Sequence, residues 1–579
     1  MNKKVFWIIL IPALLIIGAY LFVRFTLQSS LNKESNNNVL PAGDTSSIRQ
    51  SSALDLRPLF IKKLQQLVTK SSNGLYALSV SDMKLDVLNS TVSLENVSVI
   101  PDKVVLAALI EKAQAPNDVF TVSFKSFTIE GVNLDDAISS KTMDYKLVKL
   151  VQPVIEIHHA KRKPTVEKRG DFSDRFLKEM EKLSITKVII EGATVIHYND
   201  DKKGKQTKLN DFALSMNNVL VDSTTRSDKD RFLFAKEAFI SFKNFSTATT
   251  DKIYDLNIGS VTVKVPQQAV SLQNVSFKTK LSKEAFQKKI KTRKEIYDVS
   301  VPSIAIENMH WWDLLNEEQI EADAITISGL KLKVYLDRTP PPSSKMGNFP
   351  NQMLMKMAMK IAVSKLKIQN MEVAYTEFNP KSAQEGTVVL DKINMTMTGL
   401  NNTVDKMAKS RSLALTASAR FMRTVPMNAY FSLDLVQHKK GAFSAKLSVD
   451  GFDATLINSF AGPLGLVNVK EGSLQKVELN MSGDEMKATS SVLVLYKDLN
   501  VALLEKESGK QALDKKDVTS VLANVIIKNS NPKGGKDPRR ENGEFVRDPD
   551  AGFLNLVWKA GLVGILKTIG APAKLAIKK

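Results

Sequence analysis

The sequence predicts a mainly β protein: a long curved antiparallel β-sheet groove built from repeats, with a few short helices and one N-terminal transmembrane helix. Three observations predict this fold. Apolar residues alternate with polar or small ones over much of the 579 residues, as at Ile325 and Ile327, which is typical of strands with one apolar face. Turn residues such as Gly131, Gly192 and Gly399 separate these runs, which favours an antiparallel meander. A long unit occurs twice.

The repeat begins with the segment VSLENVS at 92–98, which returns 178 residues later as VSLQNVS at 270–276. The similarity continues at 122–131 and 299–308, at 185–192 and 363–370, and at 209–216 and 390–397. The two copies therefore cover 76–222 and 254–403. Repeats of this kind are typical of proteins that extend one surface, whereas an enzyme concentrates its chemistry in one cleft.

The amino-terminal element is an uncharged apolar run, Val5–Val23. A helix of this length spans roughly 28 Å, close to the hydrocarbon thickness of a bilayer. Arg24 follows directly, without an Ala-x-Ala cleavage site, so we expect an uncleaved anchor rather than a signal peptide. Lys3 and Lys4 precede the run, which predicts a cytoplasmic amino end and the bulk of the chain across the membrane.

The remaining elements follow in order along the chain. A helix is expected over 54–70, and each repeat carries one helical insertion, at 171–183 and 350–363. The predicted divisions are a cytoplasmic stub and transmembrane anchor (1–25), a flexible linker (26–53), a first β repeat with a helical insertion (54–230), a second β repeat with a helical insertion (231–410), a C-terminal β module (411–506), a polar region and mobile loop (507–552), and an amphipathic helix with a basic tail (553–579).

Composition excludes several classes of chemistry. The chain has no cysteine, which rules out disulfides, thiol nucleophiles and thiolate metal sites. Its five histidines form no His-Glu-x-x-His motif, and the nucleophile-elbow and phosphate-loop motifs do not occur. The net charge of +20 comes from lysines spread along the chain, which favours solvent-facing strand positions and an anionic membrane surface over nucleic acid. We therefore expect no catalytic residue, no cofactor, no metal and no nucleic-acid partner.

The carboxyl third carries the segments GFDATLIN at 451–458 and GSLQKVELNMSG at 472–483. With the strand–turn units such as 185–195, these resemble the AsmA-like family of Gram-negative bacteria, whose members are anchored in the inner membrane and are related in pattern to TamB-like bridge proteins. The resemblance implies a curved periplasmic β-sheet groove, an association with phospholipid movement toward the outer membrane, and no catalytic residues.

Candidate site residues fall into two groups. The candidates for lipid contact are Leu330, Leu332, Val334, Leu336, Met353, Met355, Met357 and Met359. The methionines either form a lid over lipid or fill the core from a helix. The candidates for a membrane interface are Trp311, Trp312, Leu554, Trp558, Leu562 and Ile565. The helix that carries the last four either docks on a membrane or on the end of the groove, or caps the last strands.

The anchor predicts a single span with most of the chain across the membrane, and the resemblance implies that this is the bacterial inner membrane with the chain in the periplasm. The protein would bind phospholipid and carry or conduct it toward the outer membrane, supporting outer-membrane integrity. Its expected partners are phospholipids or other acyl lipids, the inner membrane and, in one alternative, an outer-membrane protein. In that alternative the chain is a non-catalytic scaffold or assembly factor for outer-membrane proteins. An enzyme acting on envelope lipid or glycan is a third hypothesis.

Overall fold

The computed structural model describes residues 57–86, 88–131, 142–160, 181–199, 205–225, 228, 230–249, 251–316, 319–503, 523–524 and 527–573. The predicted anchor, Val5–Val23, and the predicted linker, 26–53, lie outside these residues. Within the described part of the chain, no helix has both the length and the apolar character needed to cross a membrane. The described chain is mainly β and rich in antiparallel pairs, with few short helices, which confirms the predicted class.

The chain divides into two compact units, one containing residues up to 247 with 258–270, the other containing 248–257 with 271–579. The first unit contains α2 (Arg57–Ser71), β1 (Tyr76–Asp86), β2 (Thr91–Pro101), α3 (Lys103–Glu111), β3 (Asp118–Glu130), β4 (Thr142–Val151), β5 (Val154–His159), β6 (Lys182–Asn199), β7 (Lys205–Val221) and β8 (Ala235–Ala248). The chain passes from one unit to the other at three places: at the end of β8, within β9 (Tyr254–Lys264) and near the start of β10 (Ala269–Thr279).

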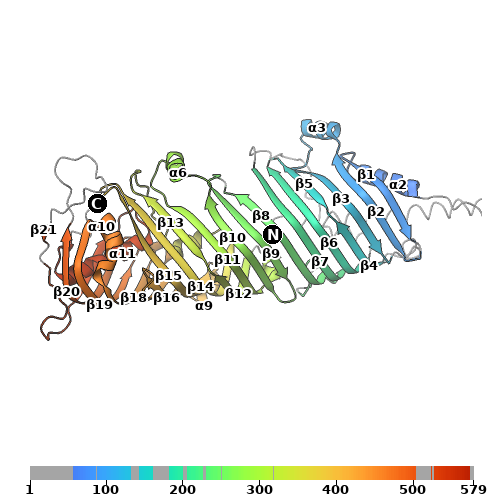
Figure 1. The fold of residues 1–579 in the computed structure, drawn as a ribbon. Helices are drawn as coiled ribbons and strands as arrows, with labels where there is room; N and C mark the ends of the chain where they lie inside the picture. The colour runs from blue at the N-terminus through green and yellow to red at the C-terminus, as the bar shows by residue number, and fades with distance from the viewer. Residues whose placement is uncertain are drawn as a thin grey trace, which may run out of the picture. The chain divides into compact units, whose positions relative to one another are not determined.

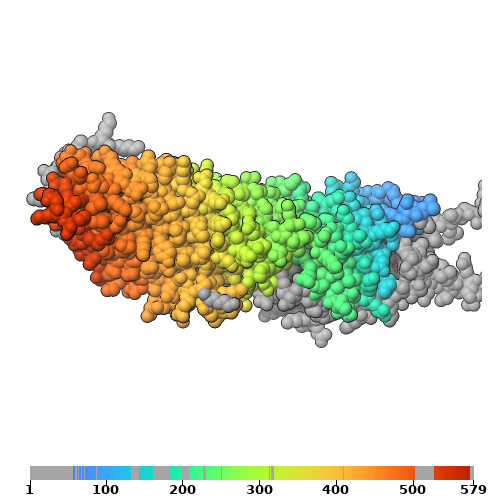
Figure 2. Space-filling model, turned by 90° about the horizontal axis from the view of Figure 1, so that it is seen from below, coloured from blue at the N-terminus to red at the C-terminus, as the bar shows by residue number. Residues whose placement is uncertain are grey.

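The second unit holds the longer part of the chain. Its elements are β10 (Ala269–Thr279), α6 (Lys283–Ile290), β11 (Ile296–Met309), α7 (Trp311–Asn316), β12 (Gln319–Ser328), β13 (Lys331–Asp337), α8 (Pro350–Lys356), β14 (Lys360–Asn379), β15 (Gln384–Asn401), α9 (Val404–Lys409), β16 (Ser412–Phe421), β17 (Val425–Asp434), β18 (Phe443–Asp453), α10 (Asn458–Gly465), β19 (Val467–Gly483), β20 (Lys487–Leu503), β21 (Ala523–Asn524), β22 (Arg540–Val546) and α11 (Phe553–Ile569). In the space-filling view, the carboxyl-terminal residues, coloured red, form the end surface of this unit (Figure 2).

Strand pairing repeats between the two sequence copies. In the first copy, β3 pairs antiparallel with β4 and β5, two short strands placed end to end, and both pair parallel with the long strand β6. In the second copy, β11 pairs in the same way with β12 and β13, and both pair parallel with β14. Antiparallel pairs β6–β7 and β14–β15 follow (Figure 1). The sequence repeat is therefore also a repeat of topology.

The parallel pairs correct the expectation of a purely antiparallel meander. Parallel neighbours require a crossover connection, because a tight turn can only reverse the chain. In the second copy, residues 338–359 make this connection and contain α8. The helix is shorter than the predicted 350–363, because the backbone is already extended at Met357 and β14 begins at Lys360. The corresponding insertion in the first copy, 171–183, lies mostly outside the described residues.

A second difference concerns the predicted loop at 507–552. Residues 504–522 lie outside the described chain, but the later part contains β22, which pairs antiparallel with β20. Asn531 is fully buried, and its side-chain amide donates to the carbonyls of Val494 and Arg539 at 2.6 and 3.0 Å. The Pro, Gly and charged residues predict a loop because of their local conformational preferences. The structure shows that the backbone of β20 provides hydrogen-bond partners for this segment, and these cannot be predicted from local sequence.

Candidate functional site

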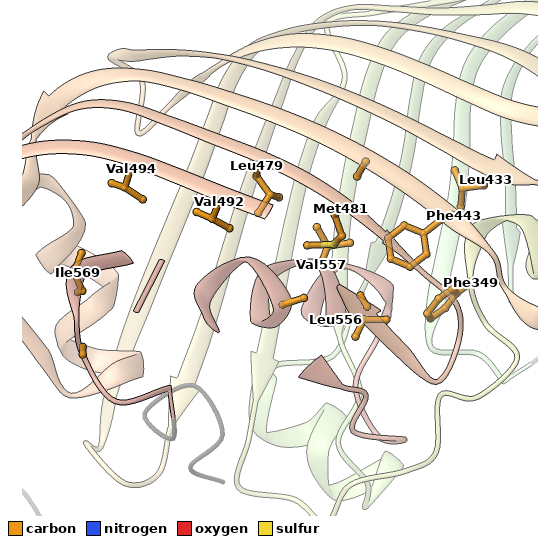
Figure 3. Close-up of a cluster of buried hydrophobic side chains, with 14 of the residues drawn as sticks. Phe349, Leu433, Phe443, Leu479, Met481, Val492, Val494, Leu556, Val557 and Ile569 are labelled. Atoms are coloured by element: carbon orange, nitrogen blue, oxygen red, sulfur yellow. The ribbon is translucent and has the colours of Figure 1, made fainter. Parts of the chain in front are cut away.

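Helix α11 packs against one face of strands β20, β22 and β19, and its first residue, Phe553, contacts Phe443 of β18. This face is named the inner face. Leu556 and Val557 of the helix lie in one cluster with Met481 and Val492 of the sheet (Figure 3). At the start of the helix, the Phe553 ring meets those of Phe349 and Phe443 edge to face, with centroids 5.0 and 4.9 Å apart. The aromatic geometry is of the kind that stabilises packed cores beyond simple burial.

Small residues allow α11 to approach the sheet closely. Ala560 is fully buried, and a Cβ atom on Gly564 would lie 2.4 Å from Cγ2 of Val492. The Ser490 hydroxyl donates to the Ala560 carbonyl at 2.8 Å, which joins helix and strand directly. At Ala560 and Gly564, the helix backbone therefore rests directly on β20.

The register of the strands extends the inner face beyond α11. Paired residues of neighbouring strands point to the same side of a sheet, and apolar residues are paired repeatedly: Leu479 with Leu447, Met397 with Leu415, and Ile325 with Leu366. We name the resulting row the apolar band; it consists of Ile304, Ile306, Ile325, Ile327, Leu366, Ile368, Met395, Met397, Leu415, Ala417, Ala429, Phe431, Ala445, Leu447, Leu479, Met481 and Val492.

The opposite face of the same strands is polar. Residues adjacent to the band in sequence point the other way because side chains alternate along a strand. They include Thr326, Lys365, Lys367, Thr396, Thr398, Thr416, Ser418, Asn428, Lys446, Glu478 and Asn480. The depression of about 370 Å³ at β14–β17 is lined largely by these polar residues, among them Lys367, Asn394 and Asn428.

Burial of the apolar band changes along the sheet. Beneath α11, Ala445, Met481 and Val492 are 1%, 5% and 0% exposed. From β11 to β16, every band residue is only half-buried, from Ile304 to Ala417. The band is therefore covered by the helix at its carboxyl-terminal end and is partly accessible to solvent elsewhere.

The matching positions of the first copy are more enclosed. Val148 and Leu150 occupy the places of Ile325 and Ile327 in the repeated topology, and they are 1% and 2% exposed. Leu214, which matches Met395, is also 2% exposed. The first unit thus buries the apolar face that the second unit leaves half-open.

Three of the predicted lipid contacts, Leu332, Val334 and Leu336, belong to the inner face, because bulges in β14 and β15 keep Val373 on the same side as Ile368. Leu332, Val334 and Leu336 of β13 pair with alternate residues of β14, and the row continues through Val373 and its partner Leu390. Leu336 is 8% exposed, and the other two are half-buried. Leu330 precedes β13 and is also half-buried.

The predicted methionine group lies largely at the surface. Met353, Met357 and Met359 are 51%, 47% and 46% exposed, and Met355 is half-buried. Helix α8 instead buries Asn351, Gln352 and Leu354. The core-filling alternative therefore does not hold for the three exposed methionines.

The predicted membrane-interface residues are found on two helices. Trp311 is half-buried in α7, and Trp312 belongs to the same helix, with its side chain outside the described part. On α11, Leu554 and Trp558 are 71% and 49% exposed, while Leu562 and Ile565 are half-buried. The helix caps the last strands with its other side, so Leu554 and Trp558 remain accessible.

Charged groups interrupt the inner face at β13–β14. The Tyr375 hydroxyl donates to Glu377 at 2.7 Å, and the guanidinium of Arg338 lies 3.3 Å from the same carboxylate. Burial, followed by the carboxylate of Glu377, raises the pKa of Tyr375. Burial lowers the pKa of Lys559 on α11, and the charge of Arg338 lowers it further. This cluster places the cationic groups of Arg338 and Lys559 near each other, between α11 and the inner face at β13–β14.

One group of potential metal ligands is present among the described residues. His310, Asp313 and Glu321 approach one another near α7 and β12. The Lys406 ammonium lies 2.5 Å from one oxygen of Glu321, and the Gln319 amide donates to the other at 2.8 Å. Because both oxygens of Glu321 are engaged, the group is a polar network and not a strong candidate for a metal site.

Sequence reasoning missed two features of the site. The alternation at Met395 and Met397 was available as a signal for the band, but its continuity depends on the strand register. The role of Ala560 and Gly564 in seating α11 had no recognisable signal. No protein-family model matches the sequence, and no curated protein matches it either.

Proposed function

We propose that the inner face of the second unit lines a curved groove that binds the acyl chains of phospholipids or other acyl lipids. The observation that supports it best is the half-buried apolar band from β11 to β16, opposed by a polar face. Acyl chains would replace water along the band, and each buried methylene contributes about 0.8 kcal/mol. Head groups would remain at the polar rim.

We further propose that the chain is anchored in the bacterial inner membrane and carries or conducts lipid toward the outer membrane. The apolar run Val5–Val23, the resemblance to AsmA-like proteins, the lack of catalytic motifs and the net charge of +20 support this assignment. Sliding along an apolar track needs no chemical step, so the proposal does not involve an enzyme.

The test uses the full chain and compares two double variants of β15. Met395→Glu with Met397→Glu places two carboxylates on the band, and Thr396→Glu with Thr398→Glu places them on the opposite face of the same strand. We expect phospholipid measured by mass spectrometry of the purified protein to fall severalfold for the methionine variant, because burying a charge beside acyl chains is unfavourable. The threonine variant should retain its lipid.

Two outcomes would contradict the proposal. Equal lipid content in both variants would mean that the retained lipid does not lie on the band. Absence of lipid from the unmodified chain, together with a stably retained outer-membrane protein, would favour the scaffold alternative. Circular dichroism and the thermal midpoint establish that both variants are folded before lipid is compared.

A further inference from the structure

Helix α3 exposes apolar residues on one side, while Val105, Leu106 and Leu109 on its other side are only half-buried. Seven consecutive residues, 104–110, are Val, Leu, Ile or Ala, yet none of the residues of this helix is buried. Val104 is 79% exposed and Ile110 is 48% exposed. A surface helix normally hides its apolar side against the sheet, so α3 presents an apolar surface to its surroundings.

The structure holds α3 firmly despite this exposure. The carboxylate of Asp102 accepts hydrogen bonds from the backbone of Val104 and Val105 at 2.8 and 3.0 Å, which caps the helix. The Asp102 amide donates to the carbonyl of Leu75 at 2.8 Å. Figure 1 shows α3 standing off the ends of β2 and β3. The apolar surface is therefore displayed by a capped, tethered element.

The position of α3 indicates what covers it. Leu75 and Gly74 join α2 to β1, and a Cβ atom on Gly74 would lie 3.9 Å from Cγ2 of Val105. Helix α2 is the element reached first from the proposed anchor, through residues 24–56. For the flexible linker that the sequence predicts over 26–53, the expected mean end-to-end distance is about 30 Å, which would keep the end of the unit that carries α3 close to the membrane of the proposed anchor.

Charge supports the same partner. At the ends of α3, Lys103 and Lys112 are balanced by Asp102 and Glu111, whereas the neighbouring helix α2 carries Arg57, Lys62, Lys63 and Lys70 and no acidic residue. Apolar helices with basic residues close by settle in the boundary between head groups and acyl chains. We propose that α3 inserts into the surface of the membrane that holds the anchor and fixes this end of the first unit on the bilayer. This inference rests on the proposed anchoring and is independent of lipid binding by the band.

The test exploits the absence of native cysteine. Single cysteines at Val104→Cys and Ile110→Cys are labelled with an environment-sensitive fluorophore, and the full chain is reconstituted in phosphatidylcholine–phosphatidylglycerol vesicles with spin-labelled lipid as quencher. Leu88→Cys is the matched control, because Leu88 is 98% exposed in the turn at the other end of β1 and β2. We expect blue-shifted emission and strong quenching at 104 and 110, and emission typical of water without quenching at 88.

A second variant tests whether the quenching depends on the apolar side chains of α3 and not on the position of one label. Ala107→Cys in a Val104→Glu and Ile110→Glu background should lose quenching while the chain still floats with the vesicles. Quenching at 88 equal to that at 104, or none at 104 in floating protein, would overturn the inference. Disulfide cross-linking between Val104→Cys copies without quenching would assign the surface to a second copy instead. Loss of flotation would overturn the anchoring itself, and with it this inference.

Discussion

At the residue scale, the ion pair of Arg547 and Glu485 connects distant parts of the second unit. The guanidinium is 2% exposed and lies 3.1 Å from the carboxylate. It also donates to the carbonyls of Lys345 and Ala551 at 2.8 and 2.9 Å and stacks over the Phe349 ring. One side chain therefore joins the crossover connection before α8 to the β19–β20 turn and to the segment before α11.

Removing this guanidinium should destabilise the second unit strongly. We expect Arg547→Ala to lower its unfolding free energy by about 3 kcal/mol, because the half-buried carboxylate of Glu485 loses its cation and the carbonyls of Lys345 and Ala551 lose their donor. The measurement is the shift of the denaturant midpoint. Arg423→Ala removes a surface pair with Glu372, whose side chains are 55% and 34% exposed, and should shift the midpoint little. Similar shifts for both variants would contradict the role assigned to burial.

The pH dependence of this pair has a definite sign. Burial raises the pKa of Glu485, but hydrogen bonds from the Gly347 amide, Gln352 and Arg547 outweigh it and leave the pKa below the usual 4.5. A carboxyl with a lowered folded-state pKa stabilises the fold above its unfolded pKa and loses that contribution as pH falls through the folded value. The stability gap between wild type and Glu485→Gln should therefore be full at neutral pH and shrink below about pH 4.5. A gap that widens in acid would refute this assignment.

At the scale of elements, α11 depends on glycine where it meets the sheet. Replacing an exposed glycine inside a helix by alanine usually stabilises it by about 1 kcal/mol. We expect the opposite sign for Gly564→Ala, a loss of about 1–3 kcal/mol, because the new Cβ would collide with Val492. Gly552→Ala at the start of the same helix is the control, since a Cβ there meets nothing within 4 Å. The measurement is the thermal midpoint of each variant. A higher midpoint for Gly564→Ala would show that α11 does not pack closely on β20 at this position.

The crossover connections have a structural role that depends on how the neighbouring strands pair. The helical insertions interrupt the alternating pattern and resemble additions to a meander. In the second copy, the insertion allows β12 and β13 to lie parallel to β14. The Arg547 network then fixes Lys345 and Gly347 within that connection. The segment is thus part of the support of the inner face.

At the scale of the whole molecule, the proposed anchoring predicts the side of the membrane on which each part lies. The test again uses single cysteines, at Asn2→Cys and at Met486→Cys, which is 62% exposed between β19 and β20. In spheroplasts, a membrane-impermeant maleimide should label position 486 at once and position 2 only after permeabilisation, because Lys3 and Lys4 favour a cytoplasmic amino end. The reverse pattern would place the units in the cytoplasm and would contradict the periplasmic assignment.

The sequence by itself determined the β class, the repeat and the faces of the strands. Alternation is a local property, so Leu332, Val334 and Leu336 could be assigned to one face before any pairing was known. The same holds for the apolar character of α11. The absence of cysteine and of catalytic motifs likewise follows from the sequence alone. It favours a function carried by an extended surface over one carried by a catalytic cleft.

Only the tertiary structure decided which apolar surfaces are covered. Leu554 and Trp558, which the sequence makes candidates for a membrane interface, are exposed, and the sheet packs on the side of α11 that carries Ala560 and Gly564 because only small residues permit the close approach. The equivalent positions Val148 and Ile325 have the same pattern in sequence, yet one is 1% exposed and the other half-buried. Burial depends on neighbours that are distant in the chain, and these cannot be identified from a local sequence pattern.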